Sequence, residues 1–141
     1  MMDQKVRNAI YNAVENEPFA KAMKMKLVEI ELGYSAVEMI YDPATMNNIY
    51  ERAHGGAVFA LIDEAFETAG QTDGTIAVAL NVNVTYVSSP EPGVKLRAEA
   101  KQNSQTKKTA SYDIKVSDQN GNLLATCSAL AYRTGKPIPF L

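Results

Sequence analysis

The chain has very little of the chemistry that cysteine, histidine and tryptophan supply. Its 141 residues include one cysteine, one histidine and no tryptophan. A single cysteine cannot form a disulfide within the chain, which favours a reducing, cytoplasmic setting. One cysteine and one histidine cannot assemble the usual kind of zinc site, so we expect no metal. Cys127 lies in the apolar run LLATCSALAY and is expected to be a small buried strand residue.

Excess positive charge and long apolar runs are also missing. Fourteen Lys and Arg residues against sixteen Asp and Glu residues give a net charge of −2, which argues against a surface that coats nucleic acid. No stretch has the pattern of a signal peptide or a membrane span. We therefore expect neither nucleic acid nor membrane as a partner. Hydrophobic residues make up 46% of the chain, enough for one domain with a core.

Three segments have helical patterns. Residues 3–16 carry an apolar stripe with Asp3 as a plausible N-cap, and Pro18 opens a second short helical turn. Residues 56–69 are apolar almost all round, which indicates a helix buried on most sides, and Gly70 is a probable stop.

The other periodic segments alternate as strands. Residues 26–42 predict two strands about a turn at Gly33, and residues 43–53 predict an irregular loop. Four more strands are expected over 75–87, 94–101, 110–118 and 122–133. Because no helix separates these later strands, we expect an α+β fold, with a curved antiparallel sheet wrapped around the apolar helix.

The alternation in residues 75–87 is strict. It predicts that one face of this strand is apolar and that the small and polar residues share the other. The apolar face would comprise Ile76, Val78, Leu80, Val82, Val84 and Tyr86. The opposite face would include Ala79, Asn81 and Asn83.

The only histidine stands directly before two glycines, His54-Gly55-Gly56, where the apolar helix begins. A helix N-terminus offers unpaired N–H groups and a positive dipole end, and glycines let a ligand approach the backbone. This junction can therefore bind a phosphate or stabilise an oxyanion. The alternative is that the glycines only permit a tight turn and that His54 is a cap.

Asp63 is an acid inside this apolar helix, where a carboxylate is costly unless it is bonded or used. The alternative is an exposed stripe shared with Glu64 and Glu67. Seven residues separate Gly56 from Asp63, about 10 Å along a helix axis. If both serve one reaction, the acid must come from a second subunit, which predicts an obligate dimer.

These residues resemble a known motif. Asn48, His54, Gly55, Gly56 and Asp63 have the spacing of hotdog-fold acyl-CoA thioesterases, in the branch that includes the phenylacetate-degradation enzymes. The resemblance spans about residues 20–134 and implies one hotdog domain over residues 1–141, with residues 1–22 as an N-terminal helical segment. It also implies hydrolysis of an acyl- or aryl-CoA thioester without a cofactor, by a dimer or a dimer of dimers.

The resemblance implies a role for each matched residue. The Gly55 N–H would polarise the thioester carbonyl, helped by the Asn48 side chain. Asp63 of the partner subunit would act as general base or as nucleophile. His54 would shape the loop and contact Asn48 or the substrate. Less certain substrate contacts are Gly56, as a turn residue, together with Phe59 and Glu67.

This sequence departs from the family pattern at two positions. Many relatives have glycine where Glu51 stands, and the larger side chain is expected to narrow the pocket or tune substrate choice. Some relatives place Ser or Thr, which helps to hold the attacking water, where Ala79 stands here. Asn81 or Asn83 is a candidate substitute.

Coenzyme A is polyanionic, so an acidic protein needs local positive charge to bind it. Lys95, Arg97 and Lys101 share one strand face. Beyond them in the chain come Lys107, Lys108 and Arg133. Ordinary solvated strand positions are the alternative for each. Two other functions stay open: a non-catalytic acyl-CoA-binding hotdog protein, and a hotdog hydratase or dehydratase.

Overall fold

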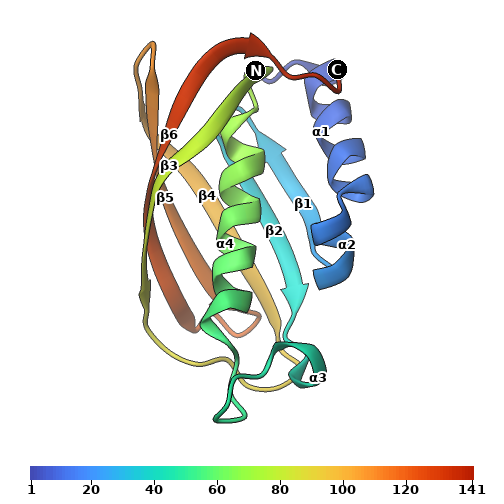
Figure 1. The fold of residues 1–141 in the computed structure, drawn as a ribbon, viewed down its shortest axis with the longest axis vertical. Helices are drawn as coiled ribbons and strands as arrows, with labels where there is room; N and C mark the ends of the chain where they lie inside the picture. Colours follow the sequence, from blue (N-terminus) through green and yellow to red (C-terminus); the bar gives the residue numbers. More distant parts are fainter.

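The computed structural model describes residues 1–141 as one six-stranded antiparallel sheet that curves around a long helix (Figure 1). The strands follow one another across the sheet in the order β1-β2-β4-β5-β6-β3. Their bounds are β1 Lys26–Glu31, β2 Tyr34–Ile40, β3 Thr75–Tyr86, β4 Lys95–Gln105, β5 Thr109–Asp118 and β6 Leu123–Pro137. The helices are α1 Gln4–Asn16, α2 Pro18–Met23, α3 Pro43–Met46 and α4 Gly55–Gly70. The predicted α+β class is confirmed.

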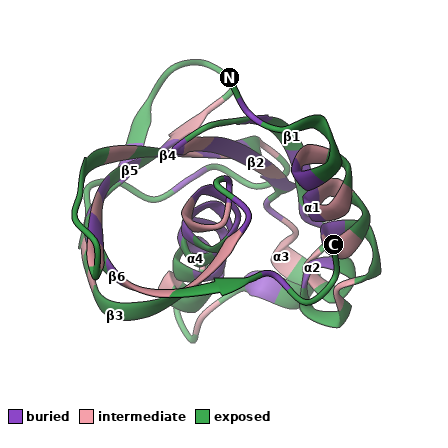
Figure 2. Ribbon diagram, turned by 90° about the horizontal axis from the view of Figure 1, so that it is seen from above, coloured by how far each residue is buried: buried purple, intermediate pink, exposed green.

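The long helix α4 lies inside the curve of the sheet (Figure 2). Its Leu61, Ile62 and Ala65 are completely buried, which accounts for the apolar character that the sequence shows on nearly all sides. The helix ends at Gly70, as predicted. Two buried hydroxyls also tie it to the sheet: Ser35 Oγ donates to the Ala65 carbonyl at 2.6 Å, and Thr68 Oγ1 donates to Ser35 Oγ at 2.9 Å.

Helices α1 and α2 lie at the side of the molecule where the curved sheet is open, beside β1 and the C-terminus (Figure 2). Asp3 caps α1 as predicted, because its side chain accepts a hydrogen bond from the Val6 N–H at 3.0 Å. The apolar stripe of α1, made of Val6, Ile10 and Val14, is buried. No helix of the structure is long and apolar enough to cross a membrane.

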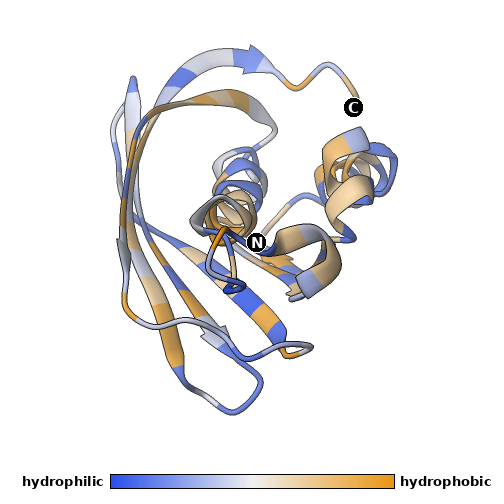
Figure 3. Ribbon diagram, turned by 60° about the horizontal axis from the view of Figure 1, so that its bottom comes forward, coloured by the Kyte–Doolittle hydropathy of each residue, from blue (hydrophilic) through white to orange (hydrophobic).

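Hydrophobic and hydrophilic residues alternate along the strands (Figure 3), as the sequence indicates. Gly33 forms the predicted β1–β2 turn with φ of +73°. The predicted loop over residues 43–53 is partly wrong, because it begins with the one-turn helix α3. The Asp42 carboxylate accepts a hydrogen bond from the Ala44 N–H at 3.0 Å, and this local bond stabilises the turn.

The predicted faces of β3 are wrong. The pairing of β3 with β6 slips by one residue between Ala79 and Asn81, which places a bulge at Leu80. Before the bulge Ala79 pairs with the buried Ala131, whereas after it Val82 pairs with the buried Ala129. Since a bulge reverses the parity of a strand, Val78 and Val82 lie on opposite faces. Ala79 and Asn81 are separated in the same way.

Candidate active site

Helix α4 begins at Gly55, and His54 is its N-cap. The His54 Nδ1 atom accepts a hydrogen bond from the Gly56 N–H at 2.8 Å, and the His54 N–H donates to the Met46 carbonyl at 2.7 Å. An accepting Nδ1 places the proton of a neutral imidazole on Nε2. The cap interpretation of His54 is therefore confirmed, and no hydrogen bond joins His54 to Asn48.

The Gly55 N–H is the one donor at this junction without an acceptor, because the Gly56 N–H bonds His54 and the Ala57 N–H bonds the His54 carbonyl at 2.9 Å. The Gly55 carbonyl accepts a hydrogen bond from the Tyr86 hydroxyl at 3.1 Å. A Cβ at Gly55 would stand 3.3 Å from the Tyr86 ring. The close approach of Tyr86 therefore favours glycine at this position.

Asn48 stabilises the loop before α4. Its Oδ1 atom accepts hydrogen bonds from the Tyr50 N–H at 2.8 Å and the Arg52 N–H at 3.1 Å. The Asn48 Nδ2 group makes no hydrogen bond and is free to donate. Within this loop Glu51 has φ of +58°, the left-handed conformation that glycine adopts without strain. Its side chain is exposed.

A cavity of about 300 Å³ opens at this end of α4, between the helix start and the end of β3. Gly55 and Val58 line it from the helix, and Tyr86 and Ser88 line it from the strand and the following loop. No acidic side chain contributes to it. This end of the helix can therefore polarise a carbonyl, but it has no group of its own that could activate water.

Asp63 lines a different cavity of about 320 Å³, whose walls include Phe66, Gly70 and Ala79. The two cavities share no residue. Burial raises the pKa of the Asp63 carboxyl above its usual range, and the negative charge of Glu17 raises it further. Eight residues of helix rise place Asp63 about 12 Å from Gly55 along the α4 axis.

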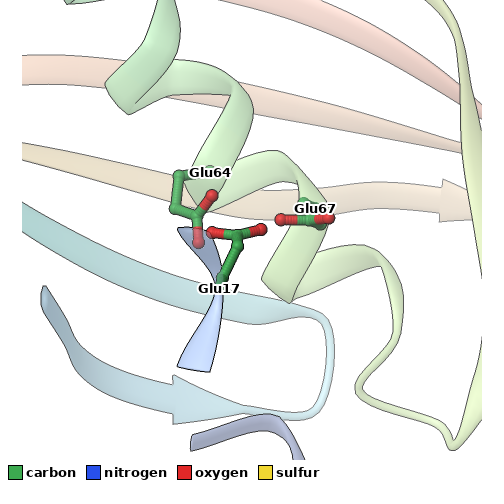
Figure 4. Close-up of side chains that lie close together, drawn as sticks. All are labelled: Glu17, Glu64 and Glu67. Carbon is green, nitrogen blue, oxygen red and sulfur yellow. The ribbon is translucent and has the colours of Figure 1, made fainter. Parts of the chain in front are cut away.

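Two more acids of α4 lie beside Asp63. The exposed stripe considered for these three acids is wrong for Glu64 only, because Asp63 and Glu67 are exposed. Glu64 is buried, with 4% of its surface exposed, and its carboxylate faces that of Glu17 (Figure 4). Glu67 faces the same point from one turn further along. Burial and the neighbouring acids raise the pKa of Glu64 to about 10 and that of Glu67 to about 7.

The remaining candidate substrate contacts are scattered. Ala79 lines the Asp63 cavity, but Asn83 lines a groove on the outer face of the sheet. Asn81 pairs with the exposed Leu130 on that same outer face. The suggestion that Asn81 or Asn83 replaces the missing hydroxyl is therefore wrong for a site beside Asp63. Phe59 lies on α4, is 36% exposed and lines neither cavity.

Part of the predicted basic patch is neutralised within the chain. Arg97 forms ion pairs with Glu29, Glu38 and Glu99 at 3.1–3.2 Å, and Lys95 lies 3.7 Å from Glu38.

At the far end of β6, Arg133 pairs with Asp73 at 2.6 Å and donates to the Thr106 carbonyl. Lys107 and Lys108 lie exposed in the β4–β5 hairpin, and Lys101 is exposed on the outer face of the sheet. Lys101, Lys107 and Lys108 thus keep unpaired positive charge.

Sequence reasoning missed two residues near these cavities. The sequence predicts Tyr86 only as part of the apolar face of β3, yet its hydroxyl donates a hydrogen bond to the Gly55 carbonyl. Glu17 was not considered, although it lies against α4 beside Asp63. A tyrosine at a strand end is a weak signal for a polar contact. Nothing in the local sequence of Glu17 predicts a partner 47 residues away in the chain.

Comparison with known proteins agrees with this arrangement. The sequence matches the profile of the Thioesterase superfamily over residues 50–125. A protein of Archaeoglobus fulgidus, whose given name is that of an unconfirmed esterase, is 31% identical over 140 residues, which cover 98% of this chain and 87% of that protein. The Escherichia coli acyl-coenzyme A thioesterase PaaI is 30% identical over 137 residues, 97% of each chain.

The comparison with solved structures also finds PaaI. The structure of Escherichia coli PaaI, from the phenylacetic acid degradation operon, has a TM-score of 0.91 at 28% identity and covers 98% of this chain and 99% of that chain. A Streptococcus mutans protein bound to acetyl CoA has a TM-score of 0.75 at 25% identity, covering 81% of this chain and 91% of that one.

The chain belongs to the thioesterase superfamily and is a thioester hydrolase. Within that superfamily it lies in the PaaI-like branch, and the predicted hotdog fold is confirmed.

Proposed function

We propose that this protein hydrolyses an acyl- or aryl-CoA thioester to a carboxylic acid and free coenzyme A. The observation that carries the proposal is the unpartnered Gly55 N–H at the positive end of α4, beside a cavity. Such a donor binds the oxyanion of a tetrahedral intermediate better than it binds the ground-state carbonyl. The Asn48 Nδ2 group is the second donor in this proposal. The Oδ1 atom of Asn48 accepts the hydrogen bonds of the loop, and Nδ2 makes none.

The proposed base is the partner subunit's Asp63. Acting on water, it would take a proton as the water oxygen attacks the carbonyl carbon, and the proton would then pass to the departing CoA sulfur. Acting as a nucleophile, it would form an anhydride that water cleaves. After a single turnover in heavy-oxygen water, label in the Asp63 carboxylate would show the nucleophilic route, with water attacking the Asp63 carbonyl of the anhydride.

The exposed edge strand β3 supports assembly of two chains. It is the last strand of the sheet and pairs only with β6. Val78, Leu80 and Tyr86 on it are 48–57% exposed, which is unfavourable for an unpaired edge in water. We therefore propose a homodimer, or a dimer of dimers, that acts in the cytoplasm as one thioesterase domain per chain and uses no cofactor for hydrolysis.

Support for CoA as the leaving group comes from the relatives, one named as an acyl-coenzyme A thioesterase and one solved with acetyl CoA. Lys101, Lys107 and Lys108 are the proposed contacts for its phosphates. If they bind the nucleotide, added salt should raise KM more than it lowers kcat.

The direct test is release of free thiol from a panel of alkyl- and aryl-CoA thioesters. Thiol release from at least one member is expected. A change in enoyl absorbance without thiol release would instead assign a hydratase, and no reaction with any member would refute the proposal.

The two-chain site has its own test in mixed dimers. Asn48→Asp and Asp63→Asn should each be inactive alone, because each removes one half of every site. Randomly mixed dimers regain one intact site out of two only if the halves come from different chains. We expect about a quarter of wild-type activity after co-expression. No recovery in dimers shown to be mixed would place both halves in one chain.

A further inference from the structure

Three carboxylates meet between the start of α2 and the middle of α4 (Figure 4). One oxygen from each of Glu17, Glu64 and Glu67 lies within 4.8 Å of the other two. None of the ion pairs in the structure includes any of these residues. Three carboxyl groups therefore stand together without a positive partner from the chain.

Glu64 differs from the other buried polar residues. Ser35, Thr68 and Thr72 are as buried as Glu64, and each of their hydroxyls has a hydrogen-bond partner. The Glu64 Oε2 atom is buried and has no partner, and its carboxylate points at Glu17 (Figure 4). A buried carboxylate oxygen without a partner is strongly destabilising, so this oxygen needs either a proton or a cation beside it.

Glu17 points to the same place from the start of α2. It is the N-cap of α2, but its side chain makes no capping hydrogen bond. The Glu17 carboxylate instead lies against α4, where its Oε2 atom is also buried without a partner. Two helices thus contribute partnerless oxygens to one point.

We propose that Glu17, Glu64 and Glu67 bind a hard divalent cation of the size of Ca²⁺. Only oxygen ligands are present, which suits Ca²⁺, Mg²⁺ or Mn²⁺ and not Zn²⁺. Ca²⁺ bonds oxygen at about 2.3–2.6 Å, so opposite ligands lie up to about 5 Å apart, whereas Mg²⁺ requires about 4 Å. The three oxygens all lie within 4.8 Å of one another, which is compatible with a shared Ca²⁺ ion. Water completes the shell from the exposed Glu67 side.

This site would join α2 to α4 and so stabilise the folded chain. It is a carboxylate site, distinct from the Cys/His zinc site that the composition excludes. Its binding is measured without any thioester, so failure of the cation proposal and failure of the proposed hydrolysis are distinguishable.

The test titrates CaCl₂ into the full-length protein, freed of metal and held at constant ionic strength and pH 8, by calorimetry and by thermal unfolding. We expect saturable binding of one Ca²⁺ per chain, with a Kd of about 10⁻⁴–10⁻³ M. Saturation should raise Tm by about 5–10 °C. Absence of saturable binding up to about 10 mM would overturn the proposal, and MgCl₂ binding as tightly as CaCl₂ would overturn the assignment of size.

Two variants locate the site. Glu64→Gln keeps the shape of the buried side chain, and Glu67→Gln changes an exposed ligand whose loss does not threaten the fold. Each should weaken Ca²⁺ binding about tenfold or more. Glu15→Gln, an exposed acid of α1 with no hydrogen bond or ion pair, is the matched control and should bind as wild type. Wild-type affinity in both cluster variants would refute the site.

Discussion

The first turn and the middle of α4 differ in the polar groups that they leave without partners. At the first turn, His54 caps the Gly56 N–H, the Asn48 Oδ1 atom satisfies two loop donors, and only the Gly55 N–H stays open. At the middle, Asp63, Glu64 and Glu67 crowd against Glu17 with no cation of the chain beside them. One region has a surplus donor, and the other has surplus acceptors.

Because its donor and its acids lie in separate regions, this helix cannot complete a catalytic site alone. Oxyanion stabilisation needs donors, and water activation needs a carboxylate that accepts a proton. Helix geometry separates the two regions by about 12 Å, much farther than hydrogen-bond reach. The following variants test the two regions in turn, beginning with the largest expected effect.

Asp63→Asn should lower kcat for thiol release by a factor of about 10²–10⁴, because the amide cannot accept the proton of water. The loss should appear with every thioester that the wild type hydrolyses. Asp113→Asn, an exposed acid on the outer face of the sheet, is the matched control and should be close to wild type. Near-normal turnover in Asp63→Asn would contradict the proposed role of the middle region.

Asn48→Asp should lower kcat/KM by about 10²–10³, because it removes the Nδ2 donor and adds negative charge near the oxyanion. The new carboxylate still accepts from the Tyr50 and Arg52 N–H groups, so the loop should persist. Steady-state kinetics measures the effect, with Asn83→Asp on the outer face as control. Equal losses in both variants would point to net charge as the cause.

Glu64→Gln should stabilise the protein at high pH in the presence of a chelator. With folded pKa values of about 10 for Glu64 and about 7 for Glu67, against 4.5 for a free Glu, the folded chain holds more protons than the unfolded chain. Stability therefore falls as pH rises from about 5 towards 9. We expect Tm of Glu64→Gln to exceed wild type by at least about 3 °C at pH 8.5 and to match it near pH 4.5.

The control for this pH dependence is Glu15→Gln, which should follow the wild-type curve at every pH. A Glu64→Gln variant less stable than wild type at pH 8.5 would show that the middle region is not under electrostatic strain.

His54→Ala should lower the free energy of unfolding by about 1 kcal/mol, since it leaves the Gly56 N–H without its cap. Urea denaturation measures the change. His54→Asn restores a side-chain acceptor at the cap position and should recover most of the loss. If Asn fails to recover it, the contribution of His54 comes from something other than capping.

Glu51→Gly should raise the free energy of unfolding by about 0.5 kcal/mol, because it relieves the left-handed backbone at φ of +58° but frees the unfolded chain. Glu91→Gly, in a loop without positive φ at that position, should destabilise under the same urea titration. Destabilisation by both would mean that the Glu51 side chain stabilises the loop.

Much of the fold could be predicted because its signals are local. The α1 cap at Asp3, the turn at Gly33 and the apolar length of α4 each depend on residues close in the chain. Because helix rise per residue is constant, the sequence also predicts that Gly55 and Asp63 are too far apart to act on one carbonyl within a chain.

The predictions that were wrong share a different cause, because each depends on a residue distant in the sequence. The faces of β3 depend on a bulge at Leu80, which forms against β6 about 50 residues later. The burial of Glu64 depends on Glu17, which α2 brings over the middle of α4. In both cases the pattern is present in the sequence. The segment that decides which way its side chains face lies far along the chain.

Residue order along the chain is therefore enough to predict most of the helices and strands and the curved sheet around α4. It also predicts a donor and an acid too far apart to meet on one helix, because helix and strand geometry is periodic. Which polar groups are left without partners depends on the folded chain: the backbone N–H of Gly55 in one region and the Glu64 carboxylate in the other. The physical reason is that satisfaction of a polar group depends on every neighbour in space, and most of those neighbours are distant in sequence.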